Sequence, residues 1–295
     1  MRKLIRGLIP ALVLTVLPVL ANAGVFVGVS VNIAPPVLPV YEQPAIPAPG
    51  YIWTPGYWAW APTGYYWVPG TWVQPPAVGV LWTPGYWGWV NGAYLWHAGY
   101  WGPHIGFYGG VNYGFGYGGV GYQGGYWRGG VFLYNRSVNN VRNSSVTNVY
   151  NRTVVNNVSV NRVSFNGGAG GIVARPSSAE LAASREQHVA FTSAQREHET
   201  MARANTSLRA SVNGGHPPIA ATARPGAFSG HGVVAAREAR EPGASPTAAP
   251  QAHNEHAPQY AGAPQGGAPH AAHETPGGGG HAGGHEPHGE HDGRR

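Results

Sequence analysis

The sequence predicts a mainly β protein: a small antiparallel meander of short hairpins, one weak helical segment and a long disordered C-terminal tail. A Trp-x-x-Gly-x-Trp motif recurs four times between residues 51 and 103 at regular spacing. β-branched and aromatic residues are frequent up to residue 166. The 46 glycines, 27 prolines and 10% charged residues do not suit one compact core, so a modest folded part with long unstructured parts is expected.

The four motif copies begin at Trp53, Trp67, Trp82 and Trp96, which lie 14, 15 and 14 residues apart. A larger unit of two motif copies is therefore present twice, and such regularity indicates a repeated architecture. The structural repeat residues are Trp53, Gly56, Trp58, Trp67, Gly70, Trp72, Trp82, Gly85, Trp87, Trp96, Gly99 and Trp101.

The Pro-Gly of each copy, which is Ala-Gly in the last, is expected to form the centre of a turn. The two tryptophans of one copy, such as Trp53 and Trp58, then lie opposite each other across a hairpin. A Pro-Gly centre prefers a type II turn, whose twist suits tight hairpins poorly. A wider, four-residue loop is therefore an alternative, and it keeps the same tryptophan pairs.

Two further turns are predicted, one inside each of the larger units. One pairs Trp60 with Tyr65, and the other pairs Trp89 with Tyr94 around Asn91-Gly92, a strong hairpin signal. Because side chains repeat every two residues along a strand, all ten tryptophans of the module are predicted on one face. These are Trp53, Trp58, Trp60, Trp67, Trp72, Trp82, Trp87, Trp89, Trp96 and Trp101.

The predicted tryptophan face has two interpretations. Aromatic platforms bind sugars or peptides through stacking and apolar contact. Alternatively the rings form the core, since ten exposed indoles would carry a severe aggregation risk. The core interpretation is favoured.

Residues 1–23 have the pattern of a secretory signal peptide. Three basic residues, Arg2, Lys3 and Arg6, come first, an apolar run follows at 8–20, and Ala21-Asn22-Ala23 supplies the small-x-small cleavage site before Gly24. The run is short for a membrane span, and no later segment is a candidate transmembrane helix. An exported protein is expected, in the periplasm, the outer envelope or the secreted fraction.

The middle of the chain divides by composition into three segments around the repeat module at 51–103. Residues 24–50 are predicted as a short strand, over 25–33, followed by a Pro-rich linker. Residues 104–130 are rich in Gly and Tyr and are expected to form a flexible aromatic loop. Residues 131–166 are a Val/Asn-rich β segment that forms a ribbon or adds to another sheet.

A helical segment is predicted over 177–212. Ser177 with Glu180, and Thr192 with Gln195, each fit a capping box, so the helix from about 178 to 210 is expected to break near Thr192. Its apolar stripe is thin, which predicts weak packing. Residues 213–295 are predicted to be disordered.

Residues 241–295 of the tail contain eight of the 14 histidines, interspersed with carboxylates, and imidazole and carboxylate suit Zn, Ni or Cu. The candidate metal ligands are His281, His285, His288 and His291. A flexible tail loses conformational entropy on forming any site, so the functional hypothesis is low-affinity metal capture. The alternative, a polar tail that keeps an aromatic protein soluble, is favoured.

No catalytic constellation is found, and no cofactor is expected. Glu42 is the only acid between residues 24 and 134, and the chain has no cysteine, so paired carboxylates and a thiol nucleophile are both missing from the repeat module. His97 and His104 are interpreted as surface side chains. Removal of the signal peptide would leave 15 basic and 12 acidic residues, too weak an excess to indicate nucleic acid binding.

The motif copies resemble the bacterial YXWGXW, or WXXGXW, repeat proteins. Tyr51-Ile52-Trp53, Tyr66-Trp67 and Tyr86-Trp87-Gly88-Trp89 carry the signature, whereas Val80 and Ala98 depart from it. The match covers the repeat module at 51–103, and a looser likeness extends to about residue 240. The resemblance implies an exported, envelope-associated protein. Separately, the aromatic residues of the repeat module suggest an envelope polysaccharide or another envelope protein as partner. The resemblance implies no activity and carries over no functional residues.

Overall fold

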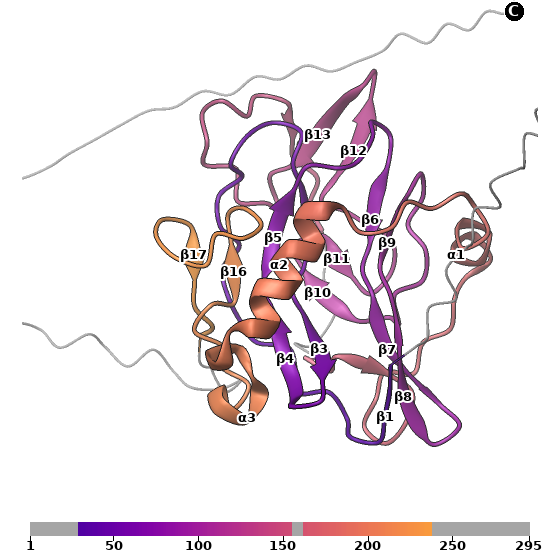
Figure 1. Cartoon of the computed structure of the whole chain (residues 1–295). Coiled ribbons are helices and arrows are strands. Elements are labelled where there is room, and N and C mark those ends of the chain that lie inside the picture. Colours follow the sequence, from indigo (N-terminus) through magenta and orange to yellow (C-terminus); the bar gives the residue numbers. More distant parts are fainter. Residues whose placement is uncertain (1–28, 155–161, 238–295) are drawn as a thin grey trace, which may run out of the picture. The chain divides into compact units, whose positions relative to one another are not determined.

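The computed structural model describes residues 29–154 and 162–237, and Figure 1 shows their mainly β fold. All elements described below belong to one compact unit. The predicted signal peptide and most of the predicted tail lie outside the described residues. Within the described ranges, no helix has both the length and the apolar character needed to cross a bilayer.

The repeat module forms two long hairpins, each interrupted halfway. The first hairpin contains β2 (Ile52–Thr54), β3 (Tyr57–Ala61), β4 (Gly64–Val68) and β5 (Gly70–Val73). The second contains β6 (Leu81–Thr83), β7 (Tyr86–Val90), β8 (Ala93–His97) and β9 (Tyr100–Gly102). The inner strands pair as β3–β4 and β7–β8, and the outer strands pair as β2–β5 and β6–β9, all antiparallel.

The prediction that each Pro-Gly is a hairpin turn is wrong. Trp53 pairs with Trp72 and Trp58 with Trp67, not Trp53 with Trp58. The second hairpin repeats this register, with Trp82 opposite Trp101 and Trp87 opposite Trp96. In the first hairpin Pro55-Gly56 faces Pro69-Gly70, and because proline has no N–H for the ladder both strands are interrupted at the same level. In the second hairpin Pro84-Gly85 faces Ala98-Gly99 at the equivalent level.

The two inner turns are confirmed. Trp60 pairs with Tyr65, and Trp89 pairs with Tyr94. Asn91-Gly92 has φ of 50° and 89° at its two residues. Positive φ at both central positions matches the type I′ turn whose twist fits a two-residue hairpin.

The Gly/Tyr-rich segment, expected to be a flexible loop, is a packed part of the fold. It contains β10 (Asn112–Gly114), β11 (Tyr117–Gly118) and β12 (Gly125–Arg128). Tyr108 and Tyr117 are fully buried. The Tyr117 hydroxyl lies 3.3 Å from the Trp53 carbonyl oxygen and 2.8 Å from that of Trp82, so it bridges equivalent points of the two hairpins. Burial of these rings and their hydroxyl bonds offsets the entropy lost by the glycines.

The Pro-rich segment is likewise held against the repeat module and is not a linker. β1 (Ser30–Val31), shorter than the predicted strand, pairs with β8. Beyond it the Trp58 indole donates to the Val37 carbonyl at 3.0 Å, and the Trp72 indole donates to that of Pro44 at 2.8 Å. Tryptophan N–H groups therefore replace the ladder bonds that a proline-rich chain cannot make.

The Val/Asn-rich segment adds strands to other sheets. β13 (Val131–Asn135) pairs with β12 and, in parallel, with β14 (Val149–Tyr150). β15 (Phe165–Asn166) joins β7 in parallel and completes a sheet with the order β1-β8-β7-β15. Of the two arrangements expected for this segment, addition to a sheet is the one observed at both ends.

The helical segment is divided more than expected. Its elements are α1 (Ser178–Ala183), α2 (Ser193–Ala204), the 3-10 helix η1 (Thr206–Leu208) and α3 (Ala210–Asn213). Both predicted capping boxes are present, at the N-termini of α1 and α2. The expected weak packing is wrong for α2, which lies against β4 (Figure 1) and buries Gln195, His198 and Ala202, because its polar side chains find partners there.

The predicted disorder of residues 213–295 is wrong for the part that the structure describes. β16 (Ala221–Thr222) pairs in parallel with β5, and β17 (Val233–Val234) pairs with β16. The resulting sheet has the order β17-β16-β5-β2. The Trp67 indole donates to the Ala220 carbonyl at 2.9 Å, so a repeat tryptophan again fixes a chain segment of weak intrinsic preference.

Candidate functional site

The glycine of each motif copy lies under a tryptophan of the paired copy. A Cβ on Gly56 would overlap Cζ2 of Trp67, and a Cβ on Gly70 would lie 2.6 Å from Cζ2 of Trp53. None of the motif glycines has a positive φ. Glycine is therefore required for close approach of the ring and not for a left-handed backbone.

The second hairpin repeats this reciprocal contact. A Cβ on Gly85 would lie 2.5 Å from Cζ2 of Trp96, and one on Gly99 would lie 2.6 Å from Cζ2 of Trp82. The first tryptophan of each copy thus covers the glycine of the other copy. One structural unit consists of two motif copies, because neither copy can cover its own glycine.

A shorter hairpin, β12–β13, has the same local arrangement without a second motif copy. Trp127 pairs with Phe132 as Trp58 pairs with Trp67, so the Phe132 ring takes the place of the Trp67 indole. A Cβ on Gly125 would lie 2.5 Å from Phe132 Cε1, as Gly56 lies under Trp67. The sequence pattern missed this hairpin, although Gly125-Tyr126-Trp127 repeats the Gly-x-Trp part of the motif.

Most repeat tryptophans belong to the core, as the favoured interpretation holds. Seven of the ten are buried: Trp53, Trp58, Trp67, Trp72, Trp82, Trp87 and Trp101. Trp60 and Trp96 are half-buried, and Trp89 is 39% exposed. Residues outside the predicted tryptophan face, such as Ile52 and Val73, are buried as well, because other segments cover the hairpins. The motif therefore mainly builds a scaffold.

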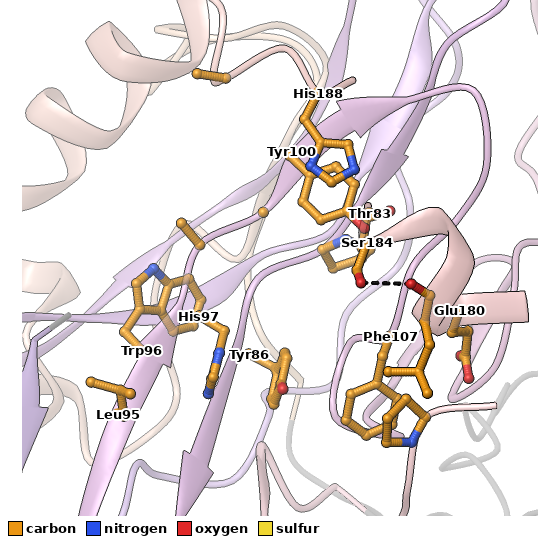
Figure 2. A pocket seen from close by; sticks show the side chains of 16 residues that line it. Thr83, Tyr86, Leu95, Trp96, His97, Tyr100, Phe107, Glu180, Ser184 and His188 are labelled. Carbon is orange, nitrogen blue, oxygen red and sulfur yellow. Dashed lines mark hydrogen bonds between the residues drawn. The ribbon is translucent and has the colours of Figure 1, made fainter. Parts of the chain in front are cut away.

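An open groove of about 750 Å³ lies on the second hairpin and is bordered by α1 (Figure 2). We call it the aromatic groove. The second hairpin lines it with Thr83, Tyr86, Trp96, His97, Ala98 and Tyr100. Phe107 and residues of α1 and its C-terminal loop, Glu180, Leu181, Ser184 and His188, form the remaining wall.

The rings of the aromatic groove are stacked on other rings. Tyr86 lies parallel to His97, with centroids 4.5 Å apart and planes at 6°. His188 stacks on Tyr100 at 3.7 Å, and Tyr57 stacks on Trp96 at 5.0 Å. Burial raises the pKa of Tyr86 to about 12 and lowers that of His97. At neutral pH the stacked pair of Tyr86 and His97 is therefore uncharged.

Glu180 supplies a carboxylate to the same wall. Its Oε2 accepts hydrogen bonds from the N–H and hydroxyl of Ser177, both at 2.8 Å, which forms the helix cap. Its Oε1 is buried and has no hydrogen-bond partner among the residues that the structure describes. An unused buried carboxylate oxygen costs free energy unless a ligand donates to it.

A second polar cluster lies where α2 meets the first hairpin. His198 accepts a hydrogen bond from the Gly226 N–H at Nδ1, 3.0 Å away, so Nε2 carries the proton and donates to the Pro69 carbonyl at 2.9 Å. Burial lowers the pKa of His198 to about 4. Burial also raises the pKa of Glu199, which accepts from the Tyr66 hydroxyl at 3.4 Å. No sequence motif marked these side chains, whose partners are distant in the chain.

The candidate residues of the sequence have different positions. His97 lines the aromatic groove, whereas His104 is exposed and lies 2.8 Å from the Glu186 carboxylate. The candidate metal ligands His281, His285, His288 and His291 lie outside the described residues. Within residues 29–154 and 162–237, no cluster of three or more His, Asp or Glu is arranged to hold a metal ion.

The fold and its contacts define a class: a mainly β repeat protein whose aromatic core is assembled from paired motif copies. A family model for the WXXGXW repeat matches the chain twice, at residues 49–73 and 78–101. Each match contains the two motif copies of one hairpin, so this part of the chain consists of two WXXGXW-repeat units. No curated protein and no solved structure matches the chain.

Proposed function

We propose that this protein is exported, has no catalytic role, and acts in the cell envelope or the secreted fraction as a rigid scaffold that presents a binding surface. The observation that carries this proposal is the burial of seven repeat tryptophans. Rings that fill a core fix the shape of the molecule, and the aromatic groove is then left as the preformed surface for recognition.

Export is supported by the order of the basic residues, the apolar run and Ala21-Asn22-Ala23. The mature chain should begin at Gly24. Cell fractionation followed by N-terminal sequencing of the envelope and secreted material tests this. Retention of Met1 in the protein recovered from those fractions would refute export through a cleaved signal.

A binding role is tested by pull-down from envelope extracts with the full mature chain as bait. Isolated envelope polysaccharide and envelope protein should be assayed separately, with intrinsic tryptophan fluorescence as the readout. The core tryptophans should emit at short wavelength in the free protein. Ligands should alter only the smaller contribution of the accessible rings, and failure of every envelope fraction to bind would refute the role.

Polysaccharide binding is a second candidate. Trp89 is 39% exposed at the tip of the second hairpin, and Trp96 and Tyr100 line the aromatic groove. If a glycan is the ligand, W89A should weaken glycan retention while folding is preserved. Unchanged retention by both W89A and groove variants would exclude these surfaces as the glycan site.

Metal capture by the histidines of the tail remains a separate hypothesis that rests on sequence alone. Zinc or nickel titration of the full chain, compared with a chain ending at residue 240, tests it directly. Uptake should require residues 241–295 and should weaken between pH 7 and 5.5 as imidazoles gain protons. Equal uptake by the two chains would remove the hypothesis.

A further inference from the structure

The two hairpins present equivalent outer surfaces, and only one of them is filled. Alignment of the two repeats relates Thr54, Pro55 and Tyr57 of the first hairpin to Thr83, Pro84 and Tyr86 of the second. These six residues line two separate cavities at corresponding positions of the two repeats. The same alignment relates Pro69 to Ala98, which also line them. What fills the first surface is therefore a guide to what the second accepts.

On the first hairpin the surface is occupied by α2 and by Phe191, which lies two residues before the helix begins. Phe191, Gln195 and His198 line the cavity there, which is reduced to about 20 Å³. His198 donates to the Pro69 carbonyl at 2.9 Å, whereas Gln195 accepts from the Trp101 indole of the second hairpin at 2.8 Å. The Phe191 ring also reaches the second hairpin, where it packs against Trp82. A phenyl ring followed by a helix with a nitrogen donor is thus the observed occupant of this type of surface.

On the second hairpin the equivalent surface is the aromatic groove, and α1 borders it without filling its volume of about 750 Å³. Ala98 there corresponds to Pro69, the acceptor of the His198 bond. Glu180 adds the buried Oε1 that lacks a protein donor in the described part of the chain. The described residues that line the groove include no Lys or Arg, so its charge complements a nitrogen donor or a cation.

The stacking geometry favours a peptide over a sugar in this groove. A sugar needs an open, flat ring face. His97 covers one face of Tyr86, His188 covers one of Tyr100 and Tyr57 covers one of Trp96. The backbone at Gly109 also crowds Tyr86, since a Cβ there would lie 2.5 Å from Tyr86 Cδ2. Each of these rings therefore offers a sugar one face at most, whereas the ring edges and the hydrogen-bond acceptors of the wall suit side chains of a helix.

We propose that the aromatic groove binds a segment of a partner protein that presents an aromatic ring followed by a helix with a histidine or arginine, in the way that residues 191–204 present Phe191 and His198. This inference rests on the proposed function, because it specifies the ligand class of the same groove. The helix-in-groove mode supplies apolar contact through the ring and orientation through the nitrogen donor.

The probe is a labelled, end-blocked synthetic peptide that copies residues 190–205, titrated with the full mature chain in a fluorescence anisotropy assay. The groove variant is L181R, since Leu181 is 44% exposed and lines the aromatic groove but not the cavity on the first hairpin. An arginine there obstructs the groove and repels a cationic donor. The matched control is V212R on α3, where Val212 is 63% exposed and lines neither cavity.

The peptide should bind, and L181R should weaken binding at least tenfold while V212R leaves it unchanged. A peptide with alanine in place of the histidine should also bind at least tenfold more weakly, and one with arginine at that position should bind at least as well. Equal binding by L181R and the unmodified chain would mean that the peptide replaces the chain's own α2 at the first hairpin, and it would overturn the proposal. Equal unfolding midpoints of the two variants exclude misfolding as the cause.

Two further outcomes separate this inference from the proposed function. Absence of peptide binding at millimolar concentration, or displacement of the peptide by neutral oligosaccharide, overturns the helix as ligand but leaves an exported binding protein intact if envelope pull-down succeeds. Peptide binding by a chain that is retained inside the cell would instead preserve the groove assignment and refute export.

Discussion

The reciprocal contact between glycine and tryptophan makes a quantitative prediction for G56A. The added methyl group would overlap the Trp67 ring and would lie 2.8 Å from both the Gly70 nitrogen and the Val68 carbonyl oxygen. Trp67 is fully buried, so neither the ring nor the paired backbone can move away at low cost. Overpacking of this kind costs about 3 kcal/mol of unfolding free energy, a large part of the stability of an ordinary domain.

A double-mutant cycle identifies the ring responsible. W67F removes Cζ2, so G56A should be less costly in that background, with a coupling of at least about 1 kcal/mol. W53F provides the matched control, because Trp53 covers Gly70 and not Gly56. The G56A and W53F effects should add to within about 0.5 kcal/mol, whereas G70A should couple to W53F.

Urea unfolding followed by far-UV circular dichroism measures all of these variants without relying on the mutated fluorophores. Under the register first expected from the sequence, Gly56 belongs to a turn between Trp53 and Trp58. A G56A cost below about 1 kcal/mol, or equal coupling of G56A to W53F and W67F, would refute the reciprocal arrangement.

Three other variants test separate parts of the structure. W67A should cost about 3–5 kcal/mol of unfolding free energy, whereas W89A, at a 39% exposed site, should cost less than about 1.5 kcal/mol; denaturant unfolding of the pair checks this, and similar costs would contradict the core assignment. H198Q should flatten the pH dependence of stability. Burial lowers the pKa of His198 to about 4, so as the pH falls the unfolded chain takes up a proton before the folded protein does. The unmodified protein should therefore lose stability between about pH 6.5 and 4, by up to about 1.4 kcal/mol per pH unit, and parallel stability curves for the two proteins would refute this. Q195A should lower the unfolding free energy by about 2–4 kcal/mol, because Gln195 both caps α2 and accepts a hydrogen bond from the buried indole of Trp101. The milder variant Q195E keeps an acceptor and serves as the control in the same unfolding assay. Equal losses of stability in the two variants would count against the hydrogen bond.

Local chemistry in the sequence predicts the strands of the repeat module, both inner turns and both helix caps. Asn91-Gly92 encodes its turn because few residues tolerate positive φ at two consecutive positions. Ser177 and Thr192 begin helices because each is followed by a residue that completes a capping box. These features depend on near neighbours in the chain and can therefore be read from one segment.

The strand register of the repeat could not be read in this way. Pro-Gly has turn chemistry when considered alone, but here Pro55-Gly56 faces Pro69-Gly70 across a continued hairpin. The poor fit of a type II turn to a tight hairpin is the one local feature that argues against a turn at Pro-Gly. Only the contact of Trp67 with Gly56, made across the strands, distinguishes an interruption from a turn.

The candidate site depends even more on distant contacts. His198 finds its acceptor at Pro69, which lies 129 residues earlier in the chain. The glycine- and proline-rich segments gain order from rings such as Tyr117 and from indole donors such as Trp58, contacts that composition does not encode. The sequence therefore predicts the scaffold residues and the helix α2, but neither the groove nor the packing of α2 against the first hairpin.

The shared covering of glycines has a consequence for how such genes can lengthen or shrink. Duplication of one whole hairpin delivers two rings together with the two glycines that they cover. Insertion or loss of a single motif copy would leave one glycine without the ring that covers it and one tryptophan without the glycine on which it packs. The strand that carries them would also lack its partner strand. Viable lengths of this module should therefore differ by whole hairpins, and even numbers of copies should predominate among its descendants.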